Sequence, residues 1–211
     1  MADLLTGSRL TPLHGNVLLG QQRGRPAFTI TVADGSRAVS QYRALRHDAF
    51  VLDQALFDHS DLDEMDDDPR LVVLVARDRS GAVVGGVRLG PAPACTGPDI
   101  GWWVGGRLVV DPAATARAGV AAALVRAACA HAEQAGVLRF EATVQTRHAG
   151  LFTGLGWQPV APVDLAGRPH LLVRWPVDRV QRLAASTKAA LGPLLAGLHL
   201  GGAGFVGDDG A

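Results

Sequence analysis

Residues 109–124, VVDPAATARAGVAAAL, have the residue types of a binding site for a phosphate group. A β-branched run stops at Asp-Pro, small residues follow, and an alanine-rich segment then begins. The N-terminus of a helix presents unpaired backbone N–H groups and a partial positive charge, which together attract anions. Gly119 would let an anion approach the backbone closely, and Arg117 offers a charge. The alternative is an ordinary helix start, in which Gly119 costs about 1 kcal/mol.

The acidic segment 61–68 is the second place where chemistry is expected, because it holds six carboxylates in eight residues. Closely spaced carboxylates raise one another's pKa, so one of them can act as a general base or hold an amine. Glu64 and Asp66 are the candidate bases, together with Asp63 and Asp67. The alternative is a solvated loop, which is the usual fate of a dense run of like charges.

The elements that must position these residues alternate along the middle of the chain. We expect helices over 37–57, 116–135 and 148–155, the first capped by Ser36 and the second ended by Gly136. Residues 78–81, DRSG, indicate a hairpin turn. The strands are expected over 28–32, 71–77, 82–89, 102–110, 137–146, 157–160 and 170–176. This order predicts an α/β fold with a mixed sheet of six or seven strands.

The segment 116–121, ARAGVA, resembles motif A of the Gcn5-related N-acetyltransferases, the GNAT superfamily. That motif is a strand, then Gln/Arg-x-x-Gly-x-Gly/Ala, then a long helix. Gly119 and Ala121 match it, whereas Ala116 stands where the family has Gln or Arg. Residues 140–157 resemble the next GNAT strand and helix. The resemblance implies a GNAT fold, with a mostly antiparallel mixed sheet, splayed central strands and flanking helices.

The same resemblance implies acetyl-coenzyme A as the cosubstrate, with its pyrophosphate on the loop amides and its pantetheine arm between the splayed strands. Phe152 stands where the family usually has the Tyr that protonates the leaving thiolate, and Phe cannot donate a proton. His148 is then the nearest candidate donor. The residues implied to contact the cosubstrate are Leu108, Val109, Val110, Arg117, Ala118, Gly119, Val120, Ala121, Ala122, Gln145, His148 and Phe152.

Two narrower resemblances concern the acceptor. Residues 43–51, the acidic segment and residues 84–89 resemble a GNAT-like branch that includes the acyl-homoserine-lactone synthases, in which the acidic loop and a hairpin Arg, here Arg88, form a polar network near the acceptor. Segments 103–110, 144–145, 155–157 and 167–170 resemble the nitrilase-cluster-associated, nitrogen-starvation type of N-acetyltransferase. Arg107 and His170 then become acceptor-binding candidates. A salt-bridged strand Arg and a hydrogen-bonded edge His are the alternatives.

Composition excludes several classes of function. The formal net charge is zero over 211 residues, which argues against a nucleic-acid or anionic-membrane partner. A signal peptide and an uninterrupted apolar run of about 18 residues are both missing, so we expect a cytoplasmic protein without a membrane span. The two cysteines form neither a disulfide framework nor a zinc pair, and no metal is expected.

The sequence thus predicts a flexible arm over 1–25, a GNAT domain over 26–178 and a tail over 179–211, whose end resembles the start of an AIR-synthase-related domain. The predicted function is acetyl transfer to a small amine or amino-acid-like acceptor, linked to nitrogen or nitrile metabolism. The alternative is a non-catalytic coenzyme A-binding sensor or partner of a nitrilase assembly. An acyl-homoserine-lactone synthase is the third hypothesis. A homodimer and an AIR-synthase-like partner are left open.

Overall fold

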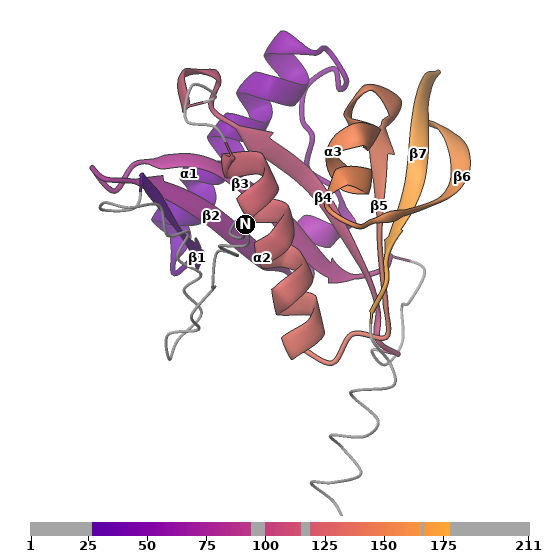
Figure 1. The fold of residues 1–211 in the computed structure, drawn as a ribbon. Coiled ribbons are helices and arrows are strands. Elements are labelled where there is room, and N and C mark those ends of the chain that lie inside the picture. The colour runs from indigo at the N-terminus through magenta and orange to yellow at the C-terminus, as the bar shows by residue number, and fades with distance from the viewer. Residues whose placement is uncertain (1–26, 94–99, 115–118, 166, 178–211) are drawn as a thin grey trace, which may run out of the picture. The chain divides into compact units, whose positions relative to one another are not determined.

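The computed structural model describes residues 27–93, 100–114, 119–165 and 167–177. Within these ranges one seven-stranded sheet has the order β1-β2-β3-β4-β5-β7-β6 (Figure 1). Its strands are β1 Phe28–Val32, β2 Val72–Asp78, β3 Val83–Pro91, β4 Trp102–Val110, β5 Arg139–Gln145, β6 Gln158–Leu165 and β7 Arg168–Trp175. Neighbouring strands are antiparallel except β4 and β5, which are parallel. The predicted mixed, mostly antiparallel sheet is confirmed.

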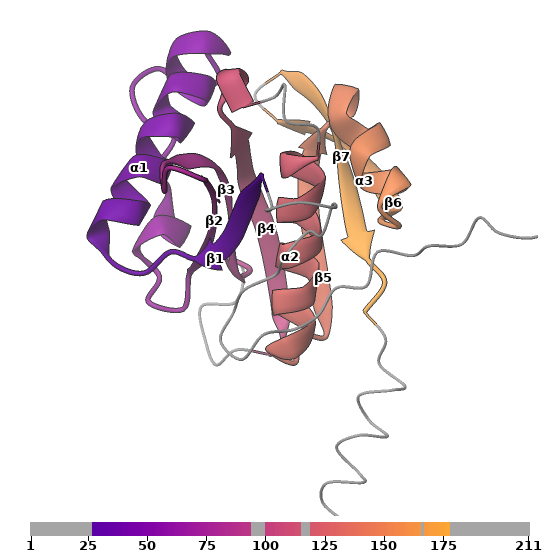
Figure 2. The same ribbon diagram turned by 60° about the vertical axis from the view of Figure 1, so that its left-hand side comes forward.

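Helices cover both faces of the sheet (Figure 2). Helix α1, Ser36–His47, lies on one face and continues into a π-helix, η1, Asp48–Asp53. Helix α2, Val120–Gln134, and helix α3, Ala149–Gly154, lie on the other. The short 3-10 helices are η2 Glu64–Asp67, η3 Pro112–Ala114 and η4 Thr146–His148. The α2 face packs around the larger core cluster, and the α1 face packs around a smaller one that contains Tyr42 and Phe50.

Some predicted boundaries are wrong. The helix expected over 37–57 is an α-helix only to His47, and its N-cap is Gly35 at φ 88° rather than Ser36, with no capping side chain. The strand expected over 157–160 runs to Leu165, because it pairs with β7 along its length. Gly136 does follow the end of α2, at φ 76°, as the sequence indicated. The segments 1–25, 115–118 and 179–211, with Arg117 and Ala118 among them, lie outside the described residues.

Strands β4 and β5 are paired only over their first halves. Their register runs from Trp102 opposite Arg139 to Gly105 opposite Ala142 and stops there. Beyond that point β4 still pairs with β3 as far as Val110, and β5 still pairs with β7 as far as Gln145. The sheet therefore splits between β4 and β5 toward the ends of both strands, as the resemblance implied.

A β-bulge in β4 lies beside this split. Gly86 is opposite Val109 and Arg88 is opposite Gly106, so β4 has one residue more than β3 between these pairs. Arg107 has a φ of 54°, which is rare for a residue other than glycine. The buried Tyr42 Oη donates to the Arg107 carbonyl oxygen at 2.8 Å. This hydrogen bond helps to hold the Arg107 backbone in a conformation that costs free energy.

Candidate functional site

A cavity of about 590 Å³ occupies the split between β4 and β5. Gly106 and Leu108 of β4 and Thr143 and Val144 of β5 line it, and all of them come after the last pair between these strands. Side chains from both core clusters also line it, so the cavity is bounded by residues of the α2 face and of the α1 face. Its volume lies within the range of about 300–1,000 Å³ that small-molecule sites have.

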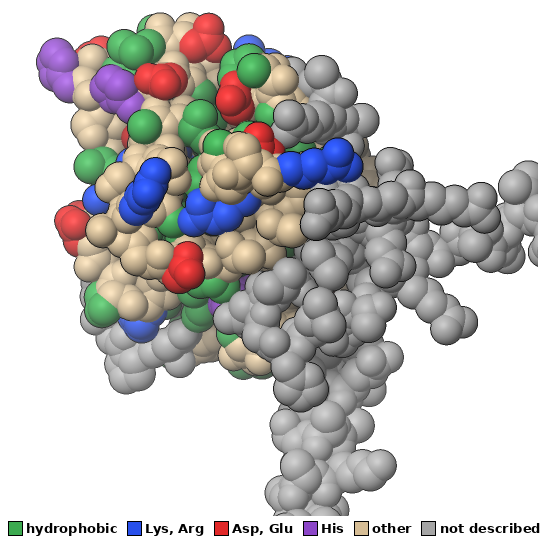
Figure 3. Space-filling view, turned by 90° about the vertical axis from the view of Figure 1, so that its left-hand side faces the viewer, with side chains coloured by type: hydrophobic (Ala, Val, Ile, Leu, Met, Phe, Trp, Pro, Cys, Tyr) green, Lys and Arg blue, Asp and Glu red, His purple; other side chains and the backbone are tan. Residues whose placement is uncertain are grey.

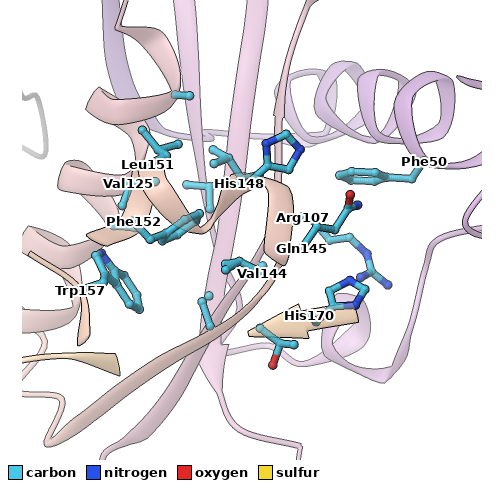
Figure 4. A pocket seen from close by; sticks show the side chains of 18 of the residues that line it. Phe50, Arg107, Val125, Val144, Gln145, His148, Leu151, Phe152, Trp157 and His170 are labelled. Carbon is cyan, nitrogen blue, oxygen red and sulfur yellow. The ribbon is translucent and has the colours of Figure 1, made fainter. Parts of the chain in front are cut away.

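The part of the cavity on the α2 face is apolar (Figure 4). Val125 of α2, Leu151 and Phe152 of α3, and Trp157 form this wall. The Phe152 and Trp157 rings meet edge to face with their centroids 5.5 Å apart, and the Phe140 and Trp157 centroids are 5.2 Å apart. Phe152 is thus packed into the wall and brings no O–H group to the cavity.

The first turn of α2 is open to an anion. Gly119 is the N-cap with φ 104°, and no side chain caps this helix end. A Cβ added to Gly119 would meet nothing within 4 Å, so no described atom crowds this position. The N–H groups of Val120, Ala121 and Ala122 have no acceptor within the helix by its geometry. Ala121 also lines the cavity, so an anion on this turn is next to the cavity.

The part of the cavity on the α1 face carries polar side chains beside the apolar Phe50 and Phe57. Its lining includes Gln54, Arg107, Gln145, His148 and His170, and Figure 4 shows Arg107, Gln145 and His170 opposite the apolar wall. Gln145 Nε2 donates to Gln54 Oε1 at 3.1 Å, which ties β5 to the end of η1. Among the described residues that line the cavity there is no Asp or Glu.

The two cavity histidines offer different atoms to a ligand. Arg147 Nε donates to His148 Nε2 at 3.1 Å, and since a guanidinium only donates, the neutral His148 ring has its proton on Nδ1. Burial and the charge of Arg147 lower the His148 pKa, which favours the neutral ring. His170 Nδ1 lies 2.8 Å from the Arg168 carbonyl oxygen, which only accepts. In the neutral His170 ring Nε2 is therefore the proton-accepting atom.

Three arginines and three aspartates form a network of ion pairs that includes the cavity residue Arg107. Its members are Arg46, Arg88, Arg107, Asp61, Asp63 and Asp66. Arg46 contacts Asp61 at 2.7 Å and Asp66 at 2.6 Å. Arg88 contacts Asp63 and Asp66, and Arg107 contacts Asp61 and Asp63. The network fixes the Arg107 side chain at the cavity, and the Arg107 guanidinium also lies over the Phe57 ring.

The candidate bases lie away from the cavity wall. Burial alone would raise the Asp66 pKa, but hydrogen bonds from Arg46 and the charge of Arg88 hold it well below the usual range. A carboxylate held in this way is a poor proton acceptor, because protonation would break its ion pairs. Glu64 is exposed and does not line the cavity. Arg88 does not line the cavity and is connected to Arg107 through Asp63, the one aspartate that both arginines contact.

The cavity brings together much of the predicted set, namely Arg107, Leu108, Val110, Ala121, Gln145, His148, Phe152 and His170. Val109 and Val120 are buried in the core instead, and neither they nor Ala122 line the cavity. The sequence missed Phe50 and Gln54, which the π-helix η1 and its end place against the cavity. The residues around Gln54 follow an ordinary helical pattern, so nothing in them indicated this role.

Comparison with known proteins places these features in context. Residues 39–156 match the sequence model of the family described as "Acetyltransferase (GNAT) family". An acyl-CoA N-acyltransferase from Pseudomonas aeruginosa is 23% identical over 70% of this chain and 97% of its own, with a TM-score of 0.58. Escherichia coli ElaA is 16% identical over 70% and 97%, with a TM-score of 0.58. BjaI, a CoA-dependent acyl-homoserine lactone synthase, is 22% identical over 73% and 82%, with a TM-score of 0.53. No curated protein sequence matches the chain.

Proposed function

Because the chain belongs to the GNAT acetyltransferase family, we propose that it transfers an acetyl group from acetyl-coenzyme A to a small amine or amino-acid-like acceptor. The enzyme class and the acyl-coenzyme A cosubstrate follow from the family. The family does not determine the acceptor, so the small amine or amino-acid-like molecule is what we propose. The observation that supports it is the cavity in the β4–β5 split, which is lined by residues from both faces of the sheet and so offers each substrate a different side.

The described residues fit coenzyme A on the α2 face. Beyond Gly105 and Ala142 the facing backbones of β4 and β5 do not pair with each other, so their polar groups are available to the amides of a pantetheine arm. We assign this contact to Leu108, Val109 and Val110, with Gln145 opposite. The apolar wall packs against the methylene groups of the arm. The first turn of α2, from Gly119 to Ala122, takes the diphosphate.

The acceptor reaches the thioester from the α1 face. Its amine nitrogen forms the new bond to the acetyl carbon as the carbon–sulfur bond breaks, and the backbone N–H groups of the Val109–Val110 region stabilise the charge on the carbonyl oxygen. The amine proton passes to His170 Nε2, directly or through water. His148 Nδ1 donates a hydrogen bond to the departing thiolate, which takes its proton from water.

Calorimetry with acetyl-coenzyme A, followed by an assay of thiol release over a panel of amines, tests this proposal. Binding together with acetyl transfer is the expected result. Binding without transfer to any amine would favour the non-catalytic alternative, which the absence of an O–H group on Phe152 motivates. No binding at high micromolar concentration would contradict the coenzyme A site itself. Heat on adding S-adenosylmethionine would favour the acyl-homoserine-lactone synthase instead.

We also infer a link to nitrogen or nitrile metabolism from the narrower resemblance. Its segments 103–110, 155–157 and 167–170 correspond to β4, the turn before β6, and the turn into β7, all beside the cavity. The AIR-synthase-like tail and the homodimer belong to the same inference, and the tail lies outside the described residues. A nitrilase gene next to the gene for this chain is expected. A neighbourhood without one would count against the link.

A further inference from the structure

Two arginines at the mouth of the cavity have only neutral hydrogen-bond partners among the described residues. Arg147 Nη2 donates to Gln54 Oε1 at 3.0 Å. Arg168 Nη2 lies 3.3 Å from the carbonyl oxygens of both Gln54 and Ala55. Within the described ranges, neither guanidinium forms an ion pair with a carboxylate. In the part of the chain that the structure describes, both guanidiniums thus lack a carboxylate partner, and both contact Gln54.

Gln54 connects this pair of charges to the site, because Gln54 itself lines the cavity on the α1 face. Arg147 directly precedes His148, and Arg168 and His170 lie on the same strand, β7. The described lining also contains no carboxylate, so the charged side chains that flank this part of the cavity are the two arginines. Arg107 is different, since Asp61 and Asp63 compensate its charge. The face on the β1 side of the molecule also differs, because acidic and basic side chains are interspersed there (Figure 3).

We propose that this mouth binds a carboxylate of the acceptor, so that the acceptor is an amino acid or another small aminocarboxylate. The inference rests on the proposed acetyl transfer and names its substrate class. Arg147 and Arg168 present planar donor groups that match a carboxylate, and Gln54 holds both in place. A diamine would bring a second positive charge to the same mouth and is disfavoured. The carboxylate stays at the mouth while the amine reaches toward His170 and the split.

A phosphate of coenzyme A has the same anionic chemistry, so the experiment must separate the two sources. Acetyl transfer is measured with each amino acid of a panel beside its α-amide, which keeps the amine and removes the negative charge. The proteins are the wild type, the double variant Arg147→Gln/Arg168→Gln, and Arg147→Lys/Arg168→Lys, which keeps the charge. Arg126→Gln, at an exposed position on α2, is the matched control. Calorimetry with acetyl-coenzyme A is run on each protein.

The expected result is a kcat/KM at least about tenfold higher for the acids than for their amides, as one charged hydrogen bond or more supplies. The Gln double variant should lose this preference through KM, the Lys variant should keep part of it, and acetyl-coenzyme A binding should not change. Amides used as well as acids by the wild type overturn the inference and leave the proposed function standing. A loss of acetyl-coenzyme A binding in the Gln variant overturns it in favour of the phosphate. Transfer to neither member of any pair contradicts both proposals.

Discussion

The two sides of the cavity offer a ligand different kinds of polar group. On the α2 face the wall consists of apolar side chains such as Val125, Leu151 and Trp157, and the polar groups on offer there are those of the backbone. On the α1 face polar side chains such as Gln54 and Gln145 stand beside the rings of Phe50 and Phe57, and a network of six charged residues holds Arg107 in place. Backbone groups depend little on side-chain identity, so they suit a cosubstrate shared by a whole family. Side-chain groups change with every substitution, so they suit a ligand particular to this chain, such as the proposed acceptor.

The two sides of the cavity are also stabilised by different interactions. The α2 face is stabilised by close packing, for example the contacts among Phe140, Phe152 and Trp157. The α1 face depends on a network in which Arg46 and Asp66 are almost fully buried, with 0% and 3% of their side chains exposed. Removing one partner from such a network leaves a charge without compensation in a dry environment. The α1 face should therefore be the more sensitive of the two to a single substitution.

The largest effect is expected for Arg46→Met, which leaves Asp61 and Asp66 without their buried partner. The free energy of unfolding should fall by about 3–5 kcal/mol, as measured by urea denaturation. Arg126→Met, at an exposed position, is the control and should change it little. A loss below about 1 kcal/mol for Arg46→Met would show that the network contributes no more than surface ion pairs do.

A smaller effect, on binding, is expected for Gly106→Val at the split. A Cβ on Gly106 would meet nothing within 4 Å, so the fold should tolerate it, but the side chain would take space from the cavity. The dissociation constant for acetyl-coenzyme A should rise about tenfold, or about 1.4 kcal/mol, in calorimetry. Gly154→Ala on α3, which also meets nothing within 4 Å, is the control. Unchanged binding in Gly106→Val would place the cosubstrate elsewhere.

The next effect is on the pH dependence of the free energy of unfolding, which should reflect the ion pairs of the arginine–aspartate network. The Asp66 pKa is lower in the folded protein than in the unfolded chain, so the stabilisation is complete above the unfolded pKa of about 4 and is lost as the pH falls below it. Asp63 has a lowered pKa for the same reason, its contact with Arg88. Between about pH 5 and pH 3 the wild type should lose more stability than Asp66→Asn does. Parallel curves for the two proteins would contradict this origin.

The smallest effect is expected for Arg117→Ala, because this residue supplements backbone donors that remain in the variant. The sequence places Arg117 just before the first turn of α2, and it lies outside the described residues. The dissociation constant for acetyl-coenzyme A should rise about threefold, less than 1 kcal/mol. Unchanged affinity would leave the helix N-terminus alone as the anion site on the α2 face.

The sequence predicted the α2 face better than the α1 face. The run before Gly119 and the apolar residues up to Trp157 are local patterns, and the resemblance placed them around the split in advance. The acidic segment was recognised as well, but its partners were not, because Asp66 meets Arg46 and Arg88 only after distant parts of the chain have packed together. Glu64 and Asp66 were expected as bases for that reason. In the fold Asp66 instead braces Arg107 through Arg88 and Asp63.

Gln54 shows a second limit of the sequence. The pattern over 37–57 fits an ordinary helix, whereas the chain forms a π-helix from Asp48 to Asp53 and Ala55 then takes a positive φ of 46°. A change in helical pitch alters which side chains share a face, so a regular pattern cannot place Gln54 at the cavity. The hydrogen bonds that hold Gln54 come from β5, η4 and β7, far along the chain.

Hydrogen–deuterium exchange with and without coenzyme A can locate the bound cosubstrate, because it requires no known acceptor. The cosubstrate should slow exchange of the amides in residues 106–110, 143–145 and 119–122, and should leave the amides of β1 and of the β2–β3 turn unchanged. Protection confined to these three segments is expected if the cosubstrate lies in the split between β4 and β5. No protection, or protection only at the β1 side of the sheet, would show that the split between β4 and β5 does not hold the cosubstrate.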